Sequence, residues 1–181
     1  MPYDVPSRVP GGTYFFTLRL ADPQSHLLVD HVDLLRQAIR IALKSHPFEI
    51  RAAVVLPAKL HMIWTLPQGD ANYGIRWRVI KSTFSRHIPA PVDARLTPAM
   101  LRRREKGIWQ RRYWEHLIRD QADYDLHEHL IIHAPVTEGL VKQPGEWALS
   151  SLHTRGRGQS HLNAPPPIAL QKTLPAAATQ F

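Results

Sequence analysis

The sequence predicts an α+β protein built on a ferredoxin-like (RRM-like) antiparallel sheet, with helices on one face, a further C-terminal helix and an irregular tail. Strand-like and helix-like segments follow one another in the order β-α-β-β-α-β. The 181 residues, 44% of them hydrophobic, suffice for one buried core but not for two ordinary domains. Many of the 16 prolines come late in the chain. We therefore expect one domain over residues 1–157, with its core at about 13–156, and a Pro/Ala-rich tail over 158–181 that is disordered or docks.

The first half of the chain supplies three strands and one helix of this order. Residues 13–20 are rich in aromatic and β-branched side chains and predict the first strand. Residues 31–45 carry Val, Leu and Ile at helical spacing, and Asp30 stands where an N-cap residue is expected. Residues 48–56 and 59–66 predict two further strands, joined by a short Pro-Ala connection.

The second half completes the order. Residues 72–88 return to helical spacing, with one apolar stripe and one basic, polar stripe. A basic, Pro-containing insertion that resembles a loop covers 87–107, and residues 108–118 predict the fourth strand. A capping signature at Asp120 begins another helix, which we expect to end before Pro135.

Positive charge is concentrated in one third of the chain. The net charge is +8, and residues 76–119 hold twelve Lys and Arg against three Asp and Glu. Such a concentration is typical of a surface that binds phosphate groups; the alternative is a solvated basic face. Aromatic side chains among the arginines add stacking surfaces, unless one or both Trp side chains belong to the core. The interleaved residues are Trp109, Arg111, Arg112, Tyr113 and Trp114.

Several classes of protein are disfavoured by what the sequence lacks. It has no apolar run of about 18 residues to span a membrane, and its first residues lack the apolar core of a signal peptide, so we expect a cytoplasmic protein. It has no cysteine, which excludes disulfides, thiolate metal ligands and a cysteine nucleophile.

One strand carries two polar side chains of chemical interest. In LPAKLHMIWTLP, residues 56–67, Lys59 and His61 are two positions apart and so share one face of the strand. The apolar side chains of Leu60, Met62 and Trp64 take the other face. The polar pair is either part of a metal site or the solvated side of a sheet.

Five blocks of the chain resemble, in order, blocks of the REP-associated tyrosine transposases, which are single-tyrosine, IS200-like transposases of the HUH endonuclease superfamily. The blocks are AAVVLPAKLHMIWTLP, RWRVIKSTFSRHIP, GIWQRRYWEHLIRD, HLIIHAPVTEGLV and WALSSLH. The resemblance covers residues from about 13 to 156. It implies a ferredoxin-like sheet, a His-hydrophobic-His motif that binds Mg²⁺ or Mn²⁺ on a central strand, and a following helix that presents a tyrosine nucleophile.

The resemblance also implies an activity. Members of the family bind single-stranded DNA whose repetitive extragenic palindromes fold as hairpins, and they nick it through a 5′-phosphotyrosine link. A metal ion polarises the scissile phosphate, and the tyrosine stores the bond energy for rejoining.

Matched position by position, this chain departs from the family pattern. The first histidine of the metal motif falls at Lys59, and the second is retained as His61. The nucleophilic tyrosine falls at Leu130, and the third metal ligand falls at Ala134. We therefore expect no bound cofactor, because a lysine repels a divalent ion and one imidazole does not hold Mg²⁺ or Mn²⁺. We hypothesise that Lys59 contacts the phosphate instead.

Two groups of residues are candidate substitutes for the lost chemistry. Tyr124 lies six residues before Leu130, a rotation of about 600° on a helix, so it is a weak candidate for the nucleophile. His129 and His133 are spaced i, i+4 and could form a zinc site with His61. The alternative is that they are surface histidines of a chain that has eleven.

We expect a transposase-family protein that binds single-stranded or hairpin DNA with little or no nicking. One alternative is an active, metal-dependent tyrosine transposase that uses non-standard residues. Another is a regulatory module that forms a homodimer or associates with an active relative. The expected DNA contacts are Lys59, Arg78, Lys81, Ser82, Arg86, Arg102, Arg103, Arg104, Arg111, Arg112 and Trp114.

Overall fold

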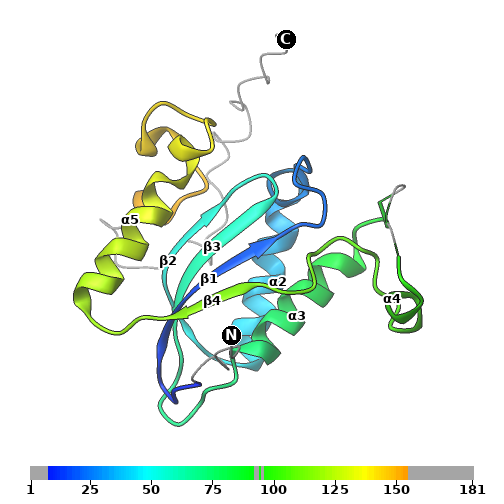
Figure 1. Ribbon diagram of the computed structural model, residues 1–181, viewed down its shortest axis with the longest axis horizontal. Helices are drawn as coiled ribbons and strands as arrows, with labels where there is room; N and C mark the ends of the chain where they lie inside the picture. Colours follow the sequence, from blue (N-terminus) through cyan, green and yellow to red (C-terminus); the bar gives the residue numbers. More distant parts are fainter. Residues whose placement is uncertain (1–7, 92–93, 95, 155–181) are drawn as a thin grey trace, which may run out of the picture.

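A computed structural model describes residues 8–91, 94 and 96–154 (Figure 1). The predicted tail, 158–181, lies outside the described residues, so the predicted domain boundary stays a prediction. The helices and strands are β1 (Thr13–Arg19), α1 (Leu27–Asp30), α2 (Val32–Ser45), β2 (Glu49–Val55), β3 (Lys59–Thr65), α3 (Tyr73–Arg86), α4 (Pro98–Arg102), β4 (Trp114–Leu117), α5 (Gln121–Thr137), η1 (Pro144–Glu146) and η2 (Ser151–Thr154). None of the described helices is long and apolar enough to cross a membrane.

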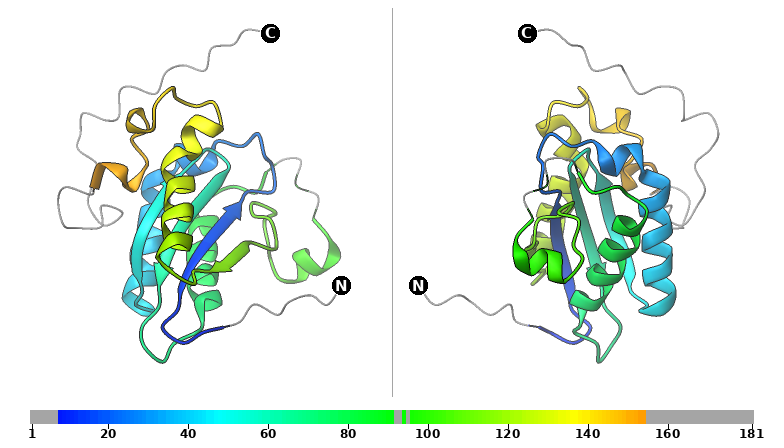
Figure 2. Two further views of the ribbon diagram at one scale, coloured as in Figure 1. Left: turned by 60° about the vertical axis from the view of Figure 1, so that its left-hand side comes forward. Right: turned by 90° about the vertical axis from the view of Figure 1, so that its right-hand side faces the viewer.

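The four strands form one antiparallel sheet in the order β2-β3-β1-β4. With α2 after β1 and α3 after β3, this is the predicted ferredoxin-like order. Helices α2 and α3 cover one face of the sheet, and α5 lies on the other (Figure 2). The predicted fold class is therefore confirmed.

The face under α2 and α3 holds the larger core. Because side chains alternate along a strand, Tyr14, Phe16 and Leu18 of β1 all point to this side. Trp64 of β3 stacks on Trp77 of α3, with ring centroids 4.0 Å apart. Both indoles are almost completely buried, which ties the sheet to α3.

The face under α5 holds a smaller core. Phe15, Val54 and Ile63 point to this side and pack with Ile131 of α5 and with Trp147. This face also carries polar and charged side chains, among them Thr17, Lys59 and His61. The two faces therefore differ in chemistry, and the site described below lies on the second.

The outer edge of β2 is covered by residues that follow η1. The Val55 amide donates to the Leu149 carbonyl at 2.9 Å, and Val54 forms an isolated antiparallel bridge with Ser150. The Ala53 amide donates to the Ser151 hydroxyl at 3.0 Å. Main-chain groups that an edge strand would leave unpaired are thus bonded within the chain.

Two predicted element boundaries were wrong near the start of a helix. Asp30 does not cap the first long helix; it ends the short helix α1, and His31 is the N-cap of α2, without a side-chain hydrogen bond. The predicted loop-like insertion contains α4, whose N-cap Thr97 accepts from the Met100 amide and whose first residue is Pro98. Proline suits the first position of a helix, because the amide at that position has no helical hydrogen-bond partner and the fixed φ of proline is close to the helical value.

Two further boundaries were wrong in the C-terminal half. The predicted fourth strand is regular only over β4, although Trp109 forms an isolated bridge with Leu20. Pro135 does not end the last helix, since α5 continues to Thr137. A proline removes only one amide donor, and the helix end is held by bonds from Glu138 to the Ala134 carbonyl and from Leu140 to the Pro135 carbonyl, both 2.9 Å.

Candidate nucleic-acid interface

His61 lies at the middle of the second face of the sheet. Its Nδ1 is 2.8 Å from the hydroxyl of Thr17, its register partner on β1, and its ring stacks on Phe15. Burial, together with the positive charges of Lys59 and Arg19, lowers the pKa of His61 to about 4. The imidazole is therefore neutral near pH 7 and adds no charge to the site.

Lys59 is held by an acidic side chain from α5. Its Nζ donates to a carboxylate oxygen of Glu138 at 2.5 Å, and the lysine side chain is only 22% exposed. Glu138 is the C-cap residue of α5. The ammonium expected at this position from the sequence is thus already paired within the protein.

Helix α5 places apolar groups at the remaining positions of the family motif. Asp120 caps the helix by accepting from the Asp123 amide at 2.9 Å, as the sequence predicts. Ala134 is buried toward the sheet, and Leu130 is 50% exposed. Neither side chain offers a nucleophile or a metal ligand.

These residues do not fit a divalent ion. Mg²⁺ and Mn²⁺ prefer several oxygen ligands, whereas His61 offers one nitrogen and Lys59 brings a positive charge. The neighbouring carboxylate of Glu138 is neutralised by Lys59.

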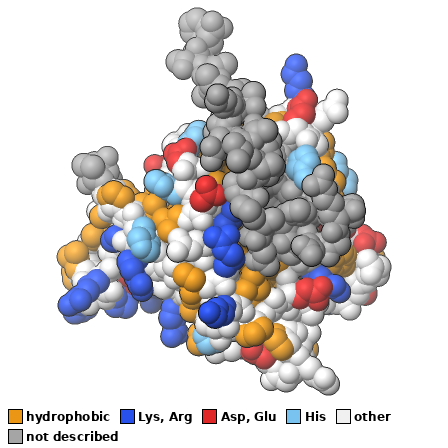
Figure 3. Space-filling view, turned by 180° about the vertical axis from the view of Figure 1, so that it is seen from behind, with side chains coloured by type: hydrophobic (Ala, Val, Ile, Leu, Met, Phe, Trp, Pro, Cys, Tyr) orange, Lys and Arg blue, Asp and Glu red, His pale blue; other side chains and the backbone are white. Residues whose placement is uncertain are grey.

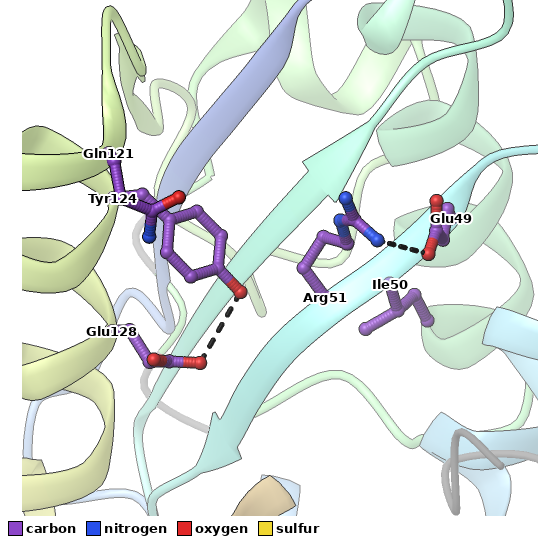
Figure 4. A pocket seen from close by; sticks show the side chains of 6 residues that line it. All are labelled: Glu49, Ile50, Arg51, Gln121, Tyr124 and Glu128. Carbon is purple, nitrogen blue, oxygen red and sulfur yellow. Dashed lines mark hydrogen bonds and ion pairs between the residues drawn. The ribbon is translucent and has the colours of Figure 1, made fainter. Parts of the chain in front are cut away.

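Tyr124 lies at the other edge of α5, against the outer strand β2. It lines a shallow hollow with Glu49, Ile50 and Arg51, and its hydroxyl donates to Glu128 at 3.3 Å (Figure 4). His61 lies on the inner strand β3. The geometry therefore gives Tyr124 no place beside His61, in line with the rotation expected along the helix.

His129 and His133 do not meet His61. Their rings stack on one another with centroids 3.9 Å apart, and Nδ1 of His133 donates to the His129 carbonyl. Within the described part of the chain, the group of three His, Asp or Glu close enough to share a metal ion is His116, Asp123 and His127. The zinc site suggested by the spacing of the two helical histidines is not formed.

Asp123 organises the junction between β4 and α5. Its carboxylate accepts from His116 Nε2 at 2.9 and 3.0 Å and from the Arg119 guanidinium and amide, and His127 Nδ1 lies 3.2 Å away. Burial raises the pKa of Asp123, but the bonds from His116 and Arg119 lower it more, so it lies below its usual range.

The sequence analysis missed this cluster. Two imidazoles and a carboxylate are donors that zinc accepts, but here Asp123 is already satisfied by Arg119 and His116. The available signal was the i, i+4 spacing of Asp123 and His127 on the predicted helix.

The cluster supports an exposed aromatic ring. Trp114 is 53% exposed, lies almost parallel to His116 with centroids 5.7 Å apart, and touches Phe15 edge-on. Trp109 instead donates from Nε1 to the Ser85 hydroxyl at 3.0 Å and packs on Phe84. The two indoles therefore have different roles. Trp109 is largely structural, whereas Trp114 has a ring face that is open to solvent.

Some of the predicted phosphate contacts are engaged inside the protein. Lys81 donates to the Gln110 carbonyl at 2.9 Å, lies over the Trp109 ring, and has a pKa lowered by burial. Arg103 is paired with Glu105 at 2.5 Å, and the exposed Ser82 hydroxyl donates to the Val79 carbonyl. Each of these side chains therefore already has a partner within the protein, and its contact with DNA stays a prediction.

Two other cations of the basic segment are also structural. Arg76 is almost completely buried and binds the carbonyls of His46 and Asn72 together with Asp70. Lys106 donates to three carbonyls at the end of α3 and so fixes the insertion there. Neither was singled out from the sequence.

Six arginines of the basic segment remain available at the surface. They are exposed, and their side chains have no hydrogen-bond or ion-pair partner among the residues that the structure describes. Several Lys and Arg side chains gather at the left of Figure 3, the side on which α4 lies in that view. The six are Arg78, Arg86, Arg102, Arg104, Arg111 and Arg112.

Comparisons with curated proteins find two similar chains. The REP-associated tyrosine transposase of Escherichia coli (strain K12) is 41% identical over 145 residues, which cover 80% of this chain and 79% of the relative. The putative REP-associated tyrosine transposase of Haemophilus influenzae (strain ATCC 51907 / DSM 11121 / KW20 / Rd) is 39% identical, with 79% of this chain and 81% of the relative covered. No protein-family model matches the chain.

A solved structure is similar over nearly the whole chain. A REP-associated tyrosine transposase bound to a REP hairpin superimposes with a TM-score of 0.73 at 37% identity, covering 93% of each chain.

Proposed function

The chain belongs to the REP-associated tyrosine transposases, and from this premise we propose that it binds single-stranded DNA folded as REP-type hairpins and has lost efficient nicking. The observation that supports the proposal is the contrast between the exposed arginines and the lack of a nucleophile or metal ligand at Leu130 and Ala134. The DNA ligand makes the cytoplasm the expected location. Association with a second copy or with an active relative stays a prediction.

The binding half of the proposal is supported by the six exposed arginines and by Trp114. The planar guanidinium group of arginine can donate two parallel hydrogen bonds to the oxygens of one phosphate. Each phosphate that is neutralised in this way releases counterions from the nucleic acid. Trp114 offers its free ring face to an unpaired base, a contact that depends little on base identity. Its support by His116 and Phe15 holds the ring in place before the base arrives.

The loss of nicking is supported by Leu130 and Ala134. A phosphodiester is attacked only by an activated nucleophile, and a leucine side chain has no atom that can form the phosphoester. Ala134 likewise offers no ligand. Lys59, which replaces a metal-binding histidine of the family, is proposed to contact the phosphate that the metal would otherwise hold.

A salt titration tests the binding. We expect the affinity for a labelled hairpin oligonucleotide with single-stranded flanks to fall with a log-log slope of about −4 if six phosphates are contacted. A slope near zero would contradict the binding surface. Lys59→Ala should weaken binding, and equal affinity of this variant and the parent would refute the proposed contact of Lys59.

A covalent-adduct assay tests the loss of nicking. The hairpin oligonucleotide is incubated with protein and Mn²⁺, and protein-DNA adducts are separated under denaturing conditions. We expect no adduct from this chain, whereas an active relative run in parallel supplies the positive control. An adduct from this chain that disappears in Tyr124→Phe would support the alternative, an active transposase with a non-standard nucleophile.

A further inference from the structure

Two positively charged side chains lie next to each other on the second face of the sheet. Arg19 ends β1, Lys59 begins β3, and the two are direct partners in the antiparallel register. Their Cβ atoms are therefore about 5 Å apart on one face. Arg19 is exposed and makes no hydrogen bond or ion pair from its side chain within the described residues. Like charges in this relation repel unless an anion lies between or beside them.

Glu138 supplies such an anion in the protein alone. Its carboxylate reaches Lys59 from the C-cap of α5, with 41% of the side chain exposed. The carboxyl end of a helix is its negative end, so a carboxylate is disfavoured there by the helix itself. The Glu138 carboxylate is therefore stabilised by the positive charge of Lys59 and not by its own helix. A phosphate that replaces this carboxylate beside Lys59 would break no other hydrogen bond or ion pair of the Glu138 side chain within the described residues.

The surroundings match a nucleic-acid backbone better than a free ion. Thr17, two residues before Arg19 on the same face, is the register partner of Trp114. The exposed indole and the cation pair are therefore separated by about 7 Å along β1, the length of two strand residues. A DNA strand with one base stacked on Trp114 can therefore place an adjoining phosphate beside Arg19 and Lys59.

We propose that Arg19 and Lys59 together bind one phosphate of the nucleic-acid backbone, and that Glu138 fills this subsite in the free protein and is displaced when the phosphate enters. The inference rests on the proposed DNA-binding function and adds to it a residue, Arg19, outside the basic segment. It also gives Glu138 the role of an internal competitor, which weakens binding and excludes weakly held anions.

The test compares charge-matched variants by fluorescence anisotropy of the labelled hairpin oligonucleotide, from about 50 to about 200 mM salt. Glu138→Gln should tighten binding about threefold or more at low salt. Asp125→Asn, which makes the same change of charge on an exposed part of α5, should tighten it less. Arg19→Gln should weaken binding and reduce the salt slope by about 0.7, whereas Arg40→Gln on α2 should change neither.

A double variant separates competition from a general change of charge. In the Lys59→Gln background, Glu138→Gln should give no more tightening than Asp125→Asn, because the competed cation is gone. Equal effects of Glu138→Gln with and without Lys59, or of Arg19→Gln and Arg40→Gln, would overturn the inference while leaving DNA binding intact. Absence of binding by the parent would overturn the proposed function itself. Arg19 is exposed, so its variant should fold.

Discussion

The two faces of the sheet differ in what they bury. The face under α2 and α3 is closed by aromatic rings, with Trp64 and Trp77 in contact and almost fully buried. The face under α5 buries polar groups beside a smaller apolar core, among them Asp123 and the half-open His61. Stability is therefore concentrated on the first face. The second carries His61 and Lys59 on β3, and Leu130 stands at the position matched to the family nucleophile.

The second face is well ordered although Leu130 and Ala134 offer no nucleophile or metal ligand at the matched positions. His61 still bonds Thr17, and the ion pair of Lys59 with Glu138 joins β3 to the end of α5. Such a pair satisfies its own charges across the two elements, so no unpaired buried charge is left behind.

The largest expected effect is a gain of activity on the second face. The triple variant Lys59→His, Leu130→Tyr, Ala134→Asn restores the ligands and nucleophile of the family and frees the Glu138 carboxylate beside them. We expect Mn²⁺-dependent adduct formation several orders of magnitude above the parent, as when a missing nucleophile is restored. The same variant with Leu130 retained is the control. A folded triple variant without adduct would contradict the positional matching.

The next largest effect is a loss of stability on the first face. Trp77→Ala should lower the free energy of unfolding by about 3–5 kcal/mol, measured by urea denaturation, because it leaves a large cavity against Trp64. Trp114→Ala is the matched control on the second face and should change stability by about 0.5 kcal/mol or less. It should instead weaken binding of the hairpin by about 1–3 kcal/mol if a base stacks there. If Trp114→Ala lowered stability more than Trp77→Ala, the assignment of stability to the first face would be wrong.

A smaller effect is expected at the buried carboxylate of the second face. Asp123→Asn should lower the free energy of unfolding by about 1–3 kcal/mol near pH 7, because charge-assisted bonds to His116 and Arg119 are weakened. The folded-state pKa of Asp123 lies below its unfolded value. Its contribution is thus complete above the unfolded value of about 3.9 and declines as the pH falls toward the folded one.

Urea denaturation between neutral pH and about pH 3 measures this dependence, since the ordinary carboxyl pKa lies within that range. The difference between parent and Asp123→Asn should shrink on acidification. Asp125→Asn, on the exposed side of α5, should match the parent throughout. A difference that stays constant with pH would show that the carboxylate charge is not what stabilises the junction.

The fold was predictable because its main signals are local. Residues 13–20 and 72–88 were placed within two residues of β1 and α3, since their periodicity agrees with the side that each buries. Helix ends predicted from a proline or an acidic residue were wrong where tertiary contacts determine the end of the helix. Pro135 predicts a helix end, yet α5 continues through it, and Asp30 predicts an N-cap, yet it ends α1.

The candidate site was predictable only in part. Leu130 and Ala134 followed from the family resemblance, but the partner of Lys59 is 79 positions away, and no local pattern indicates it. Lys81 illustrates a second reason. It lies on the polar stripe of a helix, as predicted, but its ammonium is used by the Gln110 carbonyl of a segment that folds across it.

The residues that cover β2 have a consequence for assembly. Since the amides of Ala53 and Val55 are already bonded to Ser151 and Leu149, two copies of the chain cannot join their sheets along this border without first peeling that segment away. The opposite border of the sheet is formed by β4, which offers four residues to such a pairing.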